Sequence, residues 1–291
     1  MRSPPLLSSF ALLLLTACSS TSSPTTAGPA TADGGASGGD ASATADAGGS
    51  SAPLEYKSYV ILGDSISDRG GSSPYFYDLL PKNVDATYPD YKGKDFGTRY
   101  PGIKVVKNSK GGAQSVDLVG QVNLLQETLP GPVVVSVTIG GNDMQANAVA
   151  ILQEQDQAAR DKFKTNLTNA YDALMKPGRF GADVKVKVYQ ANIYDPSDGE
   201  GNFAEAGCPA PLSLFPKKST VAGFDGWNKA LADALAKYGS DVVIVDMRGR
   251  FQGSGVGHFT DGKTWFEKDC IHPNAKGHDQ IRRVFWEAIV K

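Results

Sequence analysis

A serine that closely follows a short apolar run is the first candidate for chemistry in this 291-residue sequence. The stretch Val60–Asp68 reads VILGDSISD, so the apolar run stops at Gly63 and Ser65 comes two residues later. A buried strand that ends in this way delivers a hydroxyl to the edge of a sheet, where it can act as a nucleophile. The same residues also fit a simple turn whose serine caps a helix. The other parts of a hydrolase must decide between the two interpretations.

An acid and a base stand close together near the C-terminus. Residues 269–274 read DCIHPN, which places Asp269 three residues before His272. Acyl transfer needs a hydroxyl, a base that takes its proton and an acid that orients the base. We therefore predict Ser65 as the nucleophile, His272 as the general base and Asp269 as the acid that orients it.

Donors for a developing oxyanion follow two other apolar runs. One run leads into the segment KGGAQS, and another leads into GGND at residues 140–143. We expect the side chain of Asn142 and the backbone N–H groups of Ser65 and Gly112 to hold the oxyanion. The sequence does not decide between Gly111 and Gly112, and we prefer Gly112.

The elements that must position these residues alternate between strands and helices. Five short, β-branched apolar runs predict buried parallel strands at Tyr59–Leu62, Ile103–Val106, Val133–Ile139, Val184–Tyr189 and Val242–Val245. Helical spacing predicts helices over Pro74–Leu80, Val116–Leu129, Gln153–Met175, Val221–Tyr238 and Pro273–Val290. This order favours an α/β fold with helices on both faces of an open sheet and an active site beyond the carboxyl ends of the strands.

Two long segments interrupt this alternation, residues 82–101 and 195–220. Loops of this length beside strand ends are where such folds usually place substrate contacts. The aromatic residues Tyr75, Phe76 and Tyr77 either line a substrate pocket or pack in the core, and their helical spacing favours the core.

Together, these segments resemble the ordered blocks of the GDSL or SGNH hydrolases over residues 56–291. The resemblance implies a three-layer, flavodoxin-like fold with a five-stranded parallel sheet in the order 2-1-3-4-5. It also implies hydrolysis of carboxylic esters through an acyl-enzyme, with no metal and no cofactor. Its pattern matches Ser65, Gly112, Asn142 and His272, and Asp269 completes the triad. Ile66 replaces the leucine of the family name.

The N-terminus is typical of an exported lipoprotein. Residues 1–17 combine an early positive charge with an apolar segment, and Leu15–Cys18 reads LTAC, which resembles a lipobox. We expect lipidation at Cys18 and anchoring outside the cytoplasmic membrane or at the outer membrane; the alternative is a secreted protein that is cleaved nearby. Residues 18–53 form a low-complexity tether, because their composition cannot bury enough apolar surface to fold. Residues 54–291 form the hydrolase domain.

The remaining cysteines and histidines have their own interpretations. Cys208 and Cys270 are expected to form a disulfide in an exported protein, and the alternative is two buried free thiols. His278 is expected to pack or cap, since it lies six residues after His272 on the last predicted helix. His258 stands in the loop GVGHFT and is a candidate for bordering the substrate.

The charge pattern limits the partners. The formal net charge is −2, and no polybasic run suggests a nucleic-acid partner. We expect a monomeric serine esterase that meets the membrane only through its lipidated N-terminus. Its substrate is a lipid, lysophospholipid or acetylated carbohydrate ester. The alternative function is a non-catalytic surface binding lipoprotein on the same scaffold.

Overall fold

The computed structural model describes residues 54–291, apart from the side chains of residues 218–220. The predicted signal peptide, the tether and the lipidation site Cys18 lie outside the described residues. Within the described part of the chain, no helix is both long enough and apolar enough to cross a membrane.

The described residues contain one five-stranded parallel sheet, as predicted. Its strands are β1 (Ser58–Gly63), β2 (Lys104–Lys107), β3 (Val133–Thr138), β4 (Val186–Ala191) and β5 (Val242–Val245). They lie in the order β2-β1-β3-β4-β5, which confirms the order that the family resemblance implied. The last residue of β1, Gly63, lies opposite Thr138, the last residue of β3. The carboxyl ends of these central strands therefore meet at one edge of the sheet.

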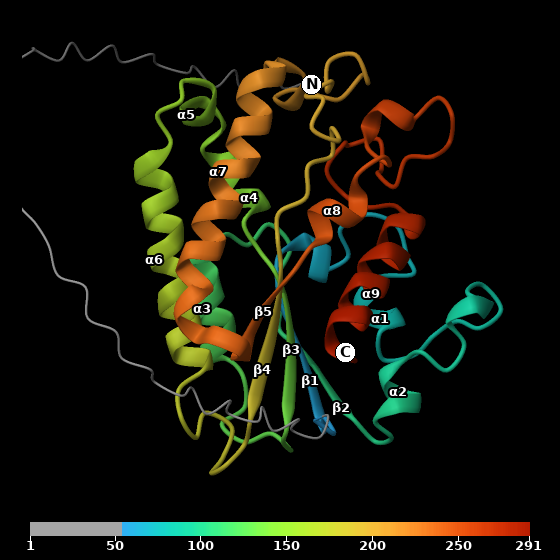
Figure 1. The fold of residues 1–291 in the computed structure, drawn as a ribbon, viewed down its shortest axis with the longest axis vertical. Coiled ribbons are helices and arrows are strands. Elements are labelled where there is room, and N and C mark those ends of the chain that lie inside the picture. The colour runs from blue at the N-terminus through green and yellow to red at the C-terminus, as the bar shows by residue number, and fades with distance from the viewer. Residues whose placement is uncertain (1–53) are drawn as a thin grey trace, which may run out of the picture. The chain divides into compact units, whose positions relative to one another are not determined.

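Helices cover both faces of the sheet (Figure 1). On one face lie α3 (Ser115–Asn123), α6 (Gln157–Leu174) and α7 (Lys217–Leu235); on the other lie α1 (Phe76–Leu79), α8 (Met247–Phe251) and α9 (Ala275–Ile289). Successive side chains of a strand point to opposite faces, so Val60 and Leu62 pack in the first core while Tyr59 and Ile61 pack in the second.

The prediction that all five strands are buried was wrong in part for β5, the other outer strand, where Ile244 is exposed, and it was wrong for β2. Lys104, Val105 and Lys107 are exposed, and Val106 is half-buried. The cause is its position, because β2 is the outermost strand beside β1 and has a neighbour on one side only. A charged residue at each end of this short strand also protects the open edge from pairing with another chain.

Several helix boundaries differ from the prediction. Helix α3 ends at Asn123, whereas the prediction extended it to Leu129. The prediction was too long because Leu125 and Leu129 are buried although they lie in the loop after the helix, and their spacing resembles that of a helix. Residues 141–152 form two unpredicted short helices, α4 (Gly141–Ala146) and α5 (Ala148–Leu152). The long segment 82–101 contains a 3₁₀ turn at Pro89–Tyr91 and one short α-helix, α2 (Phe96–Arg99).

Candidate active site

The turn after β1 places Ser65 at the carboxyl edge of the sheet. Gly63 has a φ of +125°, and a Cβ at this position would lie 2.0 Å from the carbonyl oxygen of Thr138. Only glycine allows strands β1 and β3 to approach so closely here. Ser65 then opens a 3₁₀ turn, and the N-cap of that turn is Asp64, whose carboxylate accepts the N–H of Ile66. A turn with a cap is thus present, but the serine is not its cap.

Asp64 holds this turn against the end of β3. Its buried carboxyl group accepts hydrogen bonds from the Thr138 hydroxyl at 2.9 Å and from the Ile66 N–H at 3.1 Å. Burial raises the pKa of Asp64 to about 7, and the two hydrogen bonds only partly oppose that effect. These bonds fix the backbone that carries Ser65.

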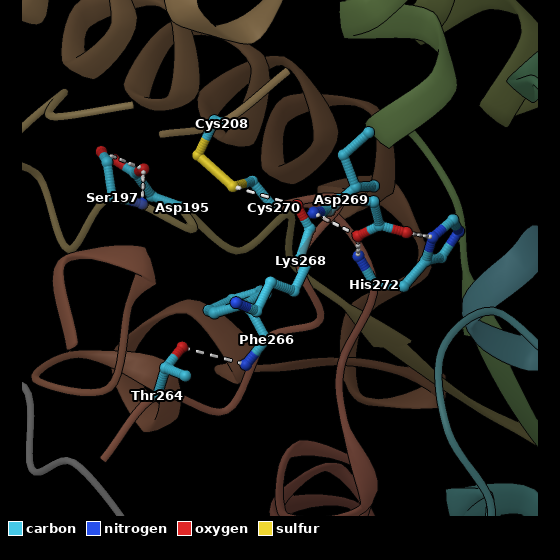
Figure 2. The surroundings of a disulfide bond; sticks show 10 residues. Asp195, Ser197, Cys208, Thr264, Phe266, Lys268, Asp269, Cys270 and His272 are labelled. Carbon is cyan, nitrogen blue, oxygen red and sulfur yellow. Dashed lines mark hydrogen bonds and ion pairs between the residues drawn. A yellow bond between two sulfur atoms is a disulfide. The ribbon is translucent and has the colours of Figure 1, made fainter. Parts of the chain in front are cut away.

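Asp269 and His272 interact within a single turn (Figure 2). One carboxylate oxygen of Asp269 lies 2.6 Å from Nδ1 of His272, and the other accepts the backbone N–H groups of Ile271 and His272 at 2.9 Å each. Burial alone would raise the pKa of Asp269, but these hydrogen bonds lower it to about 2. The hydrogen bond that His272 donates to Asp269 raises the pKa of His272, against the opposing effect of burial.

The imidazole of His272 connects this turn to the turn after β1. Its Nε2 lies 2.9 Å from the Ser65 hydroxyl oxygen, although the two residues are 207 positions apart in sequence. The structure therefore brings the three predicted residues together as a chain of two hydrogen bonds. In this series of hydrogen bonds, the Ser65 hydroxyl faces the His272 imidazole, and the ionised carboxylate of Asp269 holds the imidazole. This is the arrangement that activates a serine in acyl transfer.

The predicted oxyanion donors lie on the same rim. Asn142, in the first turn of α4, lines the pocket beside Ser65, and its amide donates one hydrogen bond to the carbonyl of Ala113 at 2.9 Å. The amide keeps its second hydrogen, since each side-chain amide nitrogen carries two. The N–H of Gly111 donates to Asp68, whereas the N–H of Gly112 meets no protein acceptor within residues 54–291. The geometry thus favours Gly112 over Gly111 as the donor.

Gly70 packs directly against the imidazole of His272, a contact that was not predicted from the sequence. A Cβ at Gly70 would lie 2.4 Å from Cδ2 and 2.9 Å from Nε2 of His272. The backbone of Gly70 is held from both sides, because its N–H donates to the Ser65 carbonyl at 2.6 Å and its carbonyl lies 2.7 Å from Nε2 of His278. The sequence signal is the pair of adjacent glycines that follows GDSISDR.

The predicted disulfide between Cys208 and Cys270 is present, with a Cα–Cα distance of 5.7 Å. Both cysteines are buried, and Cys270 directly follows Asp269 (Figure 2). The Tyr194 hydroxyl also donates to the carbonyl of Ile271. The turn that carries Asp269 and His272 is therefore joined covalently to the long segment 195–220.

The other histidines and the aromatic cluster lie outside this site. His278 is fully buried, and burial lowers its pKa to about 4, which fits the predicted packing role. His258 faces Asp261 at 2.9 Å and does not line the pocket at Ser65. Phe76 and Tyr77 belong to the second core, and neither they nor Tyr75 line that pocket.

Comparison with known proteins gives one family and one fold. The model of the GDSL-like Lipase/Acylhydrolase family matches residues 61–280. Among solved structures, the chain resembles the extracellular lipase of Streptomyces rimosus at 21% identity and a TM-score of 0.50, over 81% of this chain and 100% of that chain. It also resembles a lipase from a goat rumen metagenome, at 16% identity and a TM-score of 0.52, over 80% and 96% of the two chains.

A third similar structure is an acetyl xylan esterase from Geobacillus stearothermophilus. Its identity is 18% and its TM-score 0.52, over 81% of this chain and 96% of that chain. At these identities the likeness concerns the fold alone. No curated protein matches the sequence. The family model covers most of the described residues, and the chain therefore belongs to the GDSL-like lipase/acylhydrolase family of carboxylic ester hydrolases.

Proposed function

We propose that the protein is a serine esterase that works through an acyl-enzyme on Ser65. The observation that carries the proposal is the pair of hydrogen bonds from Ser65 to His272 and from His272 to Asp269. Family membership supports an ester hydrolase, and this geometry supports the assignment of the individual roles.

In the acylation step, the Ser65 oxygen attacks the ester carbonyl carbon while its proton passes to Nε2 of His272. The carbonyl oxygen becomes an oxyanion, held by the Asn142 amide and the N–H groups of Ser65 and Gly112. As the carbon–oxygen bond to the alcohol breaks, the protonated His272 returns the proton to the leaving oxygen. Asp269 stabilises the imidazolium that exists between these two transfers.

In the second step, water replaces the alcohol. Nε2 of His272 takes a proton from the water as it attacks the acyl carbon, and the same proton returns to the Ser65 oxygen as that bond breaks. The products are the carboxylic acid and the free enzyme, so the cycle needs no other reactant. Deacylation is a separate step, because it breaks a different ester bond, the one between the acyl group and the Ser65 oxygen.

The experiment that tests this function is rapid-mixing hydrolysis of p-nitrophenyl butyrate. We expect a burst of p-nitrophenol close to one equivalent per enzyme whenever deacylation is slower than acylation, followed by steady turnover. The steady-state value of kcat/KM should also fall about tenfold for each pH unit below the pKa of His272, because the imidazole must be neutral to accept a proton. The midpoint should lie above 6.5, since the hydrogen bond to Asp269 raises the pKa of His272.

Two results would contradict the proposal. A rate that stays constant between pH 5 and 8 would remove His272 from the role of base. Failure to hydrolyse any p-nitrophenyl ester, in a protein with a cooperative unfolding transition, would instead favour the binding lipoprotein on the same scaffold.

We also propose that the protein is exported and carries its lipid on Cys18. The support is the LTAC sequence at Leu15–Cys18 and the disulfide, a bond that persists in oxidising compartments outside the cytoplasm. The measurement is incorporation of a labelled fatty acid during growth in the native host. Label should appear on the wild type and be lost in Cys18→Ala, and equal label in both would contradict the assignment.

A further inference from the structure

An apolar pocket opens at Ser65. Its empty space is about 1040 Å³ when the open solvent at its mouth is counted. Most of its apolar walls come from the α4–α5 region, the end of β4 with the residues after it, the segment 196–215, and α7. Apolar side chains dominate these walls; they include Met144, Ile151, Ile193, Phe203, Leu212, Phe215 and Phe224.

The polar side chains in the pocket are mostly engaged with the protein. The Asn192 amide bonds Asp246 and the N–H of Arg248 at 2.8 and 2.7 Å, and the Tyr194 hydroxyl donates to the carbonyl of Ile271. Among the described residues that line the pocket, only Asp64 has a carboxyl group, and it is buried and bonded to Thr138. A sugar would lose the hydration of its hydroxyl groups here and gain few hydrogen bonds in return, which costs binding energy.

The position of the triad relative to the pocket indicates which half of an ester enters it. Ser65 and Asn142 line the pocket, whereas His272 does not. The leaving alcohol must take its proton from Nε2 of His272 and so departs on the histidine side. The acyl group stays bonded to Ser65, with its carbonyl oxygen at Asn142, and its chain therefore extends along the apolar walls.

We propose that this pocket selects esters of medium and long unbranched acyl chains, rather than acetyl esters of carbohydrates. The proposal rests on the proposed serine esterase function and names the substrate class of that site. It depends on the apolar lining and on the exclusion of His272 from the pocket. The wall at Phe203 is fixed, because that residue is buried and the Cys208–Cys270 bond ties its segment to the turn that carries Asp269 and His272.

The test compares two isomers, ethyl octanoate and octyl acetate, below their solubility limits and with product acid followed by titration. The two esters are equally apolar and differ only in which half carries the long chain. We expect kcat/KM to be about 10² to 10³-fold higher for ethyl octanoate, because each additional buried methylene group contributes up to about fourfold. Ethyl acetate should react as slowly as octyl acetate.

A blocking variant makes the test independent of intrinsic ester reactivity. Ala148 lines the pocket from the start of α5 and is half-buried, so a tryptophan there enters the pocket without replacing a core residue. Ala148→Trp should lower the ratio of kcat/KM for ethyl octanoate to kcat/KM for ethyl acetate at least tenfold. Ala146→Trp is the matched control, because Ala146 is exposed on α4 and outside the pocket lining.

The results of these experiments distinguish the acyl-chain selectivity of the pocket from the esterase function itself. Equal rates on both isomers, a preference for octyl acetate, or an Ala148→Trp variant that treats octanoate as the wild type does would each overturn the acyl assignment while leaving an active esterase. A wild-type protein that hydrolyses none of these esters, together with no burst on p-nitrophenyl butyrate, would overturn the esterase function itself.

Discussion

Replacing Ser65 with alanine is expected to lower kcat by about 10⁴ to 10⁶-fold, because the variant has no atom that can form the acyl-enzyme. The fold should be unaffected. The Ser65 hydroxyl has one hydrogen bond, to His272, while the turn is held by Asp64 and by the backbone of Gly70. The residual rate would reflect only the oxyanion donors and the apolar pocket.

The measurement is steady-state and rapid-mixing hydrolysis of p-nitrophenyl butyrate, beside thermal unfolding followed by circular dichroism. Ser240→Ala is a suitable control, because Ser240 is exposed and lies just before β5, at the opposite end of that strand from the active site. The burst should vanish in Ser65→Ala and remain in Ser240→Ala. A Ser65→Ala variant that keeps more than about one per cent of the wild-type rate would show that another group is the nucleophile.

The second largest effect is expected from Gly70→Ala, which should lower kcat by about 10² to 10³-fold with little change in KM. The φ of Gly70 lies outside the left-handed range, so the backbone itself accepts alanine. The space does not, because the new methyl group would occupy a point 2.4 Å from the His272 ring. It would also lie 2.7 Å from the Ser65 carbonyl oxygen, so the ring must shift relative to the serine turn. A displacement of about 1 Å at a reacting group costs about 10²-fold. KM should hold because Gly70 does not line the pocket.

The control is Gly120→Ala in α3, where a Cβ meets no atom within 4 Å and alanine favours the helix. Both variants should unfold cooperatively, and only Gly70→Ala should lose activity. Inactivation by a p-nitrophenyl phosphonate, which reacts with an activated serine, should slow in parallel with kcat. If Gly70→Ala keeps its rate within about threefold of the wild type, Gly70 does not position the imidazole.

The sequence allowed the sheet and the reactive residues to be predicted because both leave local signals. A β-branched run that ends in glycine marks a strand end, and Ser65 and Asn142 stand directly after such runs. Asp269 and His272 are three residues apart, so one turn fixes their contact. The exposure of β2 could not be predicted in this way. An edge strand and a central strand can have the same apolar sequence, and only the order of the strands in the sheet distinguishes them.

The pocket and the Gly70 contact could not be predicted from the sequence for a related reason. The walls of the pocket combine Met144, Phe203 and Phe224 from segments that are far apart in the chain, and each alone is an ordinary apolar residue. The role of Gly70 depends on the distance to a ring about 200 residues away in sequence. Only the three-dimensional arrangement shows that a methyl group at this position would meet the base.

The placement of the acid and the base in one turn has a consequence for inactive forms of the enzyme. Asp269 and His272 travel together, whereas Ser65 belongs to a different part of the chain and meets them through a single side-chain contact. A shift of that turn would separate the hydroxyl from the ring and leave the pairing of ring and carboxylate whole. A proton resonance from the His272 Nδ1–H would then still show the hydrogen bond to Asp269, although the protein could not hydrolyse its substrate. Whether the site is active is therefore measured only by the reaction of Ser65 with a phosphonate.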